Sequence, residues 1–178
     1  NIGMIRSQRL IYKFILKDTG TADRQSIYFL RRAAMNKDVY SMKTYADLIL
    51  SGNSHLLKDE NESYKLYKSA AELGDKDSQY KVGIKLIEEG DIDTGLLYIR
   101  ESVRLCNPEA QFYLGQQYLL GKPKGIVCQN IIKGIGLIQM AMNQNYSLAF
   151  EKIGELFLDN NFIMLDYIQA FYYLNIAF

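Results

Sequence analysis

Tryptophan is absent from this sequence of 178 residues, which also has two prolines, two cysteines and one histidine. Two cysteines, Cys106 and Cys128, are too few for the dense disulfide framework of a small secreted domain, which favours a reducing compartment, the cytoplasm or an organelle matrix. Neither has a histidine nearby in sequence, which argues against a thiol nucleophile. The histidine, His55, lies in a loop-like segment without cysteines or carboxylates at metal-ligand spacing and is interpreted as a solvated loop residue.

An excess of one charge and long apolar runs are also missing. Lysine and arginine total 21 and aspartate and glutamate total 20, so the net charge of +1 creates no broad field that attracts nucleic acid. The longest apolar stretch, residues 131–142, is shorter than a bilayer crossing and contains Lys133. We therefore expect no nucleic-acid partner and no direct membrane insertion.

Three segments resemble chemical motifs but lack their defining features. Residues 121–125 contain glycine and lysine without the spacing of a phosphate-binding loop, and the acidic residues 88–93 lack the alternating ligands of a calcium loop. The aromatic residues 171–173 fit the packing positions of a helix, and no basic stripe for nucleic acid accompanies them. We therefore expect no enzyme activity, no metal and no cofactor.

Apolar residues recur at three- and four-residue steps, which predicts helices separated by short turns. Two kinds of helix alternate along the chain, each centred on a small residue that we call its anchor. The anchors of the first kind, the A helices, are Ala46, Gly83, Gly115 and Gly154. The anchors of the second kind, the B helices, are Ser26, Ser63, Gly95, Gly134 and Ala170.

The spacing of the anchors reveals a repeat. From each B anchor to the next A anchor the separation is 20 residues, whereas from A to B it is 17, 12, 19 and 16 residues. The B-to-A connection is therefore predicted to be rigid and the A-to-B connection variable. Small anchors let helix axes approach closely, and stacked helix pairs bury a core that no single pair can form.

This pattern resembles Sel-one-like repeats, which are related to tetratricopeptide repeats. The best matches are residues 110–121, which read Ala-x-x-x-Leu-Gly-x-x-Tyr-x-x-Gly, and residues 63–74 for the second half of the consensus. The resemblance covers residues 22–178 and departs from the consensus at Ala46, which replaces glycine, and at Cys106 and Asn145, which occupy the glycine position at a helix end. It implies an all-α fold, an α-solenoid in which antiparallel helix pairs form a right-handed superhelix.

We predict one α-solenoid domain over residues 1–178, with about nine helices, no β-sheet and four to five repeats. The predicted repeats are 1–38, 39–75, 76–107, 108–146 and 147–178. Residues 4–16 form either the A helix of the first repeat or an N-terminal cap. Because Asn1 is not an initiator methionine and Phe178 lies in an apolar helix pattern, we expect a larger chain, and we expect more chain or a partner to cover that last helix.

Tetratricopeptide geometry, carried onto the A helices, places residues three before and one or four after each anchor on the concave face. The predicted partner-binding residues are Lys43, Asp47, Tyr80, Ile84, Ile87, Phe112, Gln116, Leu119, Glu151 and Glu155. Packing between helices is the alternative for Ile87 and Leu119. A partner segment is predicted to cross Tyr80, Ile84, Phe112 and Gln116, because aromatic residues with a polar rim are typical of interface hot spots.

The resemblance implies a non-catalytic scaffold or adaptor that binds a protein or peptide partner on the concave face within a larger complex. A regulatory or substrate-recruiting arm of an enzyme located elsewhere in the chain or complex is one alternative. A permanent structural subunit of an organellar assembly is another. The sequence itself does not select among them, because fold class alone does not determine function.

Overall fold

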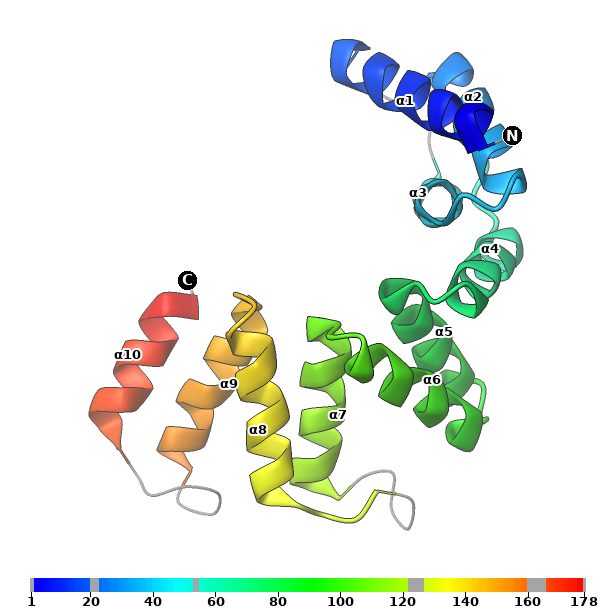
Figure 1. Cartoon of the computed structure of the whole chain (residues 1–178). Coiled ribbons are helices and arrows are strands. Elements are labelled where there is room, and N and C mark those ends of the chain that lie inside the picture. Colours follow the sequence, from blue (N-terminus) through cyan, green and yellow to red (C-terminus); the bar gives the residue numbers. More distant parts are fainter. Residues whose placement is uncertain (1, 20–22, 53–54, 122–126, 160–165, 178) are drawn as a thin grey trace. The chain divides into compact units, whose positions relative to one another are not determined.

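The computed structural model describes residues 2–19, 23–52, 55–121, 127–159 and 166–177. Within these ranges the chain forms ten helices and no β-strand (Figure 1). The helices are α1 (Ile2–Thr19), α2 (Arg24–Met35), α3 (Val39–Ser51), α4 (Glu60–Glu72), α5 (Lys76–Glu88), α6 (Ile92–Arg104), α7 (Pro108–Leu120), α8 (Ile131–Met142), α9 (Ser147–Leu158) and α10 (Tyr167–Ala177). The all-α prediction is confirmed, and the helix count exceeds the predicted nine because residues 4–16 belong to the complete helix α1.

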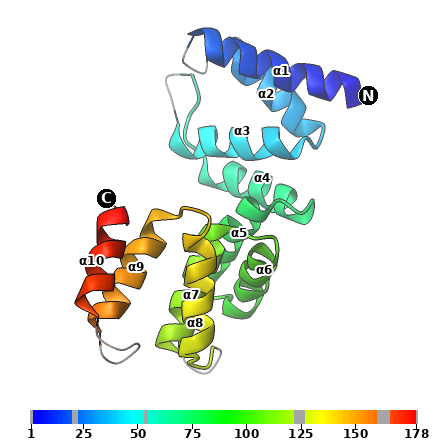
Figure 2. The same ribbon diagram turned by 60° about the vertical axis from the view of Figure 1, so that its left-hand side comes forward.

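The chain divides into two compact units, Asn1–Val82 and Gly83–Phe178, and the boundary lies within α5. In the first unit α1 packs on α2, α2 on α3 and α3 on α4. In the second unit each helix from α6 to α10 packs on the next one (Figures 1 and 2). Each of the five predicted repeat ranges encloses two consecutive helices. That residues 1–178 form a single domain stays a prediction.

Each unit has its own apolar core. The core of the first unit consists of Tyr12, Ile27, Leu30, Ala34, Met42, Tyr45, Ile49 and Ala70. A core cluster of the second unit consists of Leu119, Ile138, Ala141, Ala149, Ile153 and Leu156. These side chains come from both helix types, as expected when helix pairs bury their apolar faces against each other.

In the second unit, A and B helices approach each other at glycine anchors. A Cβ built on Gly115 would lie 2.9 Å from the carbonyl oxygen of Gly134, and one built on Gly134 would lie 2.9 Å from the carbonyl oxygen of Gly115. Gly83 and Gly95 make the same reciprocal approach between α5 and α6, at 2.9 Å and 2.7 Å. Such distances leave no room for a side chain, so the two helices pass close to each other at these anchors.

In the first unit, a serine and an alanine take the place of the glycine pair. The Ser63 hydroxyl donates a hydrogen bond of 2.9 Å to the carbonyl oxygen of Ala46, and both residues are buried. The contact between α3 and α4 therefore has a side-chain hydrogen bond at the position where α7 and α8 each have a glycine. This explains how the repeat tolerates Ala46 at a position that is glycine in the consensus.

The constant B-to-A separation has a local cause in the turn after each B helix. The residue 11 positions after the B anchor has a positive φ in four turns, at Lys37 (62°), Gly74 (88°), Cys106 (57°) and Asn145 (60°). The next residue's N–H donates back to the carbonyl seven positions after the anchor, as from Asn107 to Ser102 at 3.0 Å. This bonding closes the helix in a Schellman-type turn of fixed length.

The residue that directly follows each left-handed residue is the N-cap of the next A helix. Asp38, Asp75 and Asn107 accept side-chain hydrogen bonds from backbone N–H groups three residues later, at distances of 3.0, 2.8 and 2.7 Å. A left-handed residue followed directly by an N-cap therefore joins the two helices without a spare residue. The fourth turn ends at Tyr146, which makes no side-chain cap.

We expect Cys106→Gly to raise the free energy of unfolding by about 0.5–1 kcal/mol, because a left-handed conformation strains any residue with a Cβ. Gly74→Ala is the reverse test and should lower it by about 1 kcal/mol, since a Cβ there would meet nothing within 4 Å and only the backbone cost remains. Chemical denaturation of both variants measures the two changes. Opposite signs support the turn assignment, and equal signs would contradict it.

Candidate functional site

A surface cavity of about 350 Å³ lies between α7 and α9 in the second unit. Its lining residues are Phe112, Gln116, Leu148, Glu151, Lys152 and Glu155. Four of them, the two from α7 and the two glutamates from α9, are among the predicted partner-binding residues. The structure therefore brings together one predicted group from two successive A helices.

Helical spacing places these side chains on common faces. Phe112 and Gln116 are four residues apart on α7, and the α9 residues are spaced by three, four and seven from Leu148, so they lie along one side of that helix. Helix α7 begins at the N-cap Asn107 with Pro108 in its first turn. The start of α7 is thus well defined, which fixes the register of the side chains in the cavity.

Phe112, which lines the cavity, belongs to an aromatic pair. The rings of Phe112 and Tyr146 meet edge to face, with centroids 5.4 Å apart and planes at 61°. Both side chains are half-buried at the edge of the core cluster of α8 and α9. Burial raises the pKa of Tyr146, and the negative charge of Glu109 raises it further. An acidic residue therefore lies near this aromatic pair.

Three of the four residues that line the cavity from α9 are charged. Lys152 Nζ lies 2.7 Å from Glu155 Oε2 one turn along α9, and both side chains remain partly exposed. Leu148 adds an apolar side chain that is 46% exposed. Leu148 and Lys152 were not predicted, because the tetratricopeptide register considered only three positions per helix. Both could have been found from the spacing i, i+3, i+4, i+7 along α9, which places Leu148 and Lys152 on the same helix face as the two glutamates.

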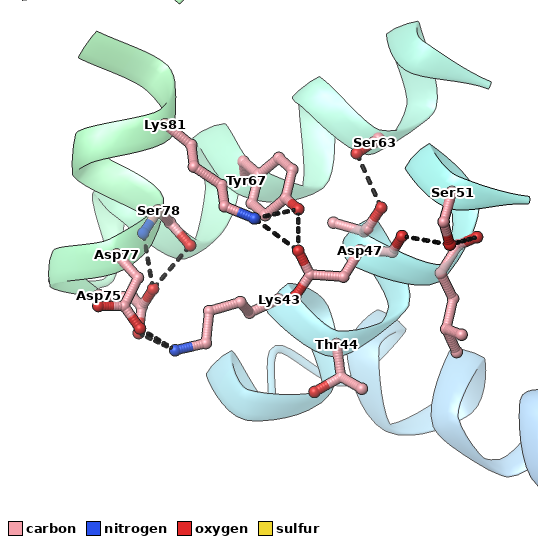
Figure 3. A network of polar contacts seen from close by, with 12 residues as sticks. Lys43, Thr44, Asp47, Ser51, Ser63, Tyr67, Asp75, Asp77, Ser78 and Lys81 are labelled. Carbon is pink, nitrogen blue, oxygen red and sulfur yellow. Dashed lines mark hydrogen bonds and ion pairs between the residues drawn. The ribbon is translucent and has the colours of Figure 1, made fainter. Parts of the chain in front are cut away.

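Lys43 and Asp47 from α3 were also predicted to bind a partner. Both form ion pairs and hydrogen bonds within the first unit (Figure 3). Lys43 Nζ contacts the carboxylates of Asp77 and Asp75, the latter at 3.5 Å. Asp47 accepts hydrogen bonds from the Tyr67 hydroxyl and from Lys81 Nζ, the latter at 2.5 Å. These contacts tie α3 to α4 and to the start of α5.

The network includes three residues whose pKa is raised, Lys43, Lys81 and Tyr67. Burial opposes the charge of Lys43, but hydrogen bonds and charges from Asp77 and Asp75 raise its pKa above the ordinary value. The pKa of Lys81 is raised in the same way by Asp47 and Tyr67 against the effect of burial. The pKa of Tyr67 is raised by burial and by its hydrogen bond to Asp47.

The remaining predicted residues differ in exposure. Tyr80 and Ile84 on α5 are half-buried, one turn apart. Ile87 packs against Gly95 of α6, and Leu119 is only 2% exposed, within the core beside Gly134. Leu119 therefore presents almost no surface to a partner, which agrees with the alternative of packing between helices. The reason is its position, which faces the anchor of the paired B helix.

Among the described residues, no three His, Cys, Asp or Glu side chains are grouped closely enough to hold a metal ion. Likewise, no described helix has both the length and the apolar character needed to cross a bilayer. The cavity residues include no histidine or cysteine, and its charged groups lie at a rim rather than in an enclosed pocket. Its chemistry is suited to holding side chains of another molecule.

Solved structures share this fold across nearly the whole chain. A protective antigen of uropathogenic Escherichia coli with an SLR fold, c5321, matches with a TM-score of 0.82 and 21% identity, covering 97% of this chain and 38% of its own. A Sel1 repeat protein of Oxalobacter formigenes matches with a TM-score of 0.81 and 22% identity, covering 97% and 72%. The immunity protein Pa5087 of Pseudomonas aeruginosa matches with a TM-score of 0.63 and 20% identity, covering 86% and 56%.

The chain thus spans well under half the length of the E. coli protein that it resembles. No curated protein sequence is significantly similar to it. The family model described as Sel1 repeat matches residues 20–38, 44–75, 108–151 and 154–178, which together make up more than half of the chain. Sequence pattern, helix architecture and family model agree that this all-α repeat solenoid belongs to the Sel1 repeat family.

Proposed function

We propose that the chain is a non-catalytic scaffold that binds a protein or peptide partner, within a larger complex, through the surface of its A helices. The single observation that carries this proposal is the cavity between α7 and α9, which combines a half-buried aromatic ring with a charged rim. Sel1 repeats generally serve as non-catalytic interaction modules. In such interfaces a few aromatic anchors contribute most of the binding energy.

The proposed binding surface is centred on Phe112 and Gln116 of α7 and on Glu151 and Glu155 of α9. It extends to Leu148 and Lys152, which line the same cavity. Tyr80 and Ile84 of α5 are half-buried on one helix face and stay predicted partner-binding residues, separate from this cavity. We exclude Lys43 and Asp47 from the proposed surface, since their charges already pair with residues of α5 and of the turn between α4 and α5.

The test begins with co-purification of a tagged protein and identification of its partner by mass spectrometry. A Tyr80→Ala, Phe112→Ala double variant is expected to weaken binding of that partner by about 2 kcal/mol or more, roughly 30-fold in Kd, because truncation removes the aromatic anchors. Titration calorimetry measures the affinity, and circular dichroism verifies that the variant is folded.

Tyr28→Ala is the matched control, because Tyr28 is an aromatic residue of α2 that is 53% exposed and lies outside the cavity. This variant should bind the partner like the unmodified chain. Undiminished affinity in a folded double variant would place the binding site on the B helices or the variable connections instead.

A further inference from the structure

The surface formed by α7 and α9 has an excess of negative charge. Glu109 is the one charged residue in the sequence of α7, and α9 carries Glu151, Lys152 and Glu155. The ammonium of Lys152 is held by Glu155 at 2.7 Å. Among the described cations, none forms an ion pair with Glu109 or Glu151. Two carboxylates beside the aromatic pair thus remain available to a cation from another molecule.

The aromatic ring of Phe112 indicates which kind of cation this surface would bind. Phe112 lines the cavity, and its ring is held in position by the edge-to-face contact with Tyr146. A guanidinium group is planar, stacks on aromatic rings and forms paired hydrogen bonds with a carboxylate. A lysine ammonium is a more strongly hydrated point charge and makes neither the stacked nor the paired contact. The combination of Phe112 and Glu151 therefore favours arginine.

The size of the cavity limits what can enter it. A volume of about 350 Å³ is at the low end for sites that hold small ligands, so the cavity accommodates one or two side chains. The exposed side chain of Leu148 offers an apolar contact next to the charged rim. From these contacts we infer that the partner inserts an arginine side chain between Phe112 and Glu151 and lays a neighbouring apolar side chain on Leu148. This inference rests on the proposed function and names the chemistry of the partner.

A phage-displayed library of short random peptides provides a probe that does not require the natural partner. The immobilised chain of residues 1–178 selects binders, and peptides that also bind Phe112→Ala are removed. The enriched peptides are expected to carry an arginine next to a large apolar residue. Because the chain has no tryptophan, binding of a tryptophan-labelled peptide can be followed by its own fluorescence.

Glu151→Gln, which keeps the shape of the side chain and removes its charge, should weaken the best arginine peptide about tenfold. Replacing the peptide's arginine with lysine should weaken it as well, and binding should decrease as salt is raised from about 0.05 to 0.5 M. Glu72→Gln is the matched control, because Glu72 is an exposed carboxylate of α4 in the other unit, and it should have no effect.

The outcomes separate this inference from the proposed function. Selected peptides that depend on Phe112 but lack arginine, or that bind Glu151→Gln unchanged, overturn the inference and leave the binding surface standing. A selection that yields no peptide dependent on Phe112 overturns both. If Phe112→Ala does not fold, Gln116→Arg repeats the comparison, because it adds a cation to the cavity wall from a residue that is not part of the core.

Discussion

Replacing Gly115 with leucine is expected to lower the free energy of unfolding by about 3 kcal/mol or more. Even the Cβ of the new side chain would lie 2.9 Å from the Gly134 carbonyl oxygen and 2.7 Å from Ile138 Cγ1. A backbone oxygen cannot move aside by changing rotamer, so α7 and α8 would have to separate. Because neighbouring repeats share their interfaces, the loss would also weaken the contacts of α8 with α9.

Gly136→Ala in α8 is the matched control for this experiment. A Cβ on Gly136 would meet nothing within 4 Å, so the substitution should stabilise the helix by about 0.5–1 kcal/mol through higher helix propensity. Thermal unfolding followed by circular dichroism measures both variants. If Gly115→Leu unfolds at the same temperature as the unmodified chain, the close contact between these two helices is misassigned.

Raising the pH above about 10 is expected to unfold the chain progressively, through groups whose pKa is higher in the folded than in the unfolded state. Burial is the main cause for the tyrosines concerned: Tyr12, Tyr45, Tyr67, Tyr113 and Tyr146. Lys43 and Lys81 shift in the same direction through their aspartate partners, although burial opposes it. The stability from these groups is fully present below their unfolded pKa values and is lost as the pH rises through the folded ones.

The slope of the unfolding temperature against pH tests this origin. Tyr113→Phe removes one half-buried ionisable group, so its unfolding temperature should fall less steeply between about pH 8 and 11 than that of the unmodified chain. Tyr167→Phe serves as the control, since the side chain of Tyr167 is 69% exposed. Identical slopes in all three proteins would mean that the tyrosines with a raised pKa do not drive alkaline unfolding.

Much of the fold could be predicted because the helix anchors are small residues of two alternating kinds, with a fixed separation from each B anchor to the next A anchor. Gly115 faces Gly134, and Ala46 contacts Ser63, as the shared anchor role of these residues suggested. The left-handed residue Lys37 could not be predicted, since a lysine carries no sign of positive φ and only its place in the turn imposes it. Gly74 occupies the equivalent position of another turn without strain, because glycine adopts the left-handed conformation freely.

The candidate site was predicted only in part, and each deviation has a physical reason. Lys43 and Asp47 have the charge of a rim, but the sequence did not indicate that Asp75 and Lys81 would neutralise them within the chain. The hydrogen bond of 2.8 Å that the buried side chain of Gln111 accepts from Gln144 Nε2 could not be predicted either. Pairings between distant segments depend on three-dimensional geometry that periodicity does not contain.

The turns that close the B helices also explain where this kind of protein can change over evolution. Each turn joins two helices with no spare residue, so an inserted amino acid there would break its hydrogen bonds and change how the next helix packs on the one before. An insertion between an A helix and its B helix lengthens only a surface connection, at small entropic cost. Such a chain can therefore diversify what individual repeats display while inheriting unchanged the way in which they stack.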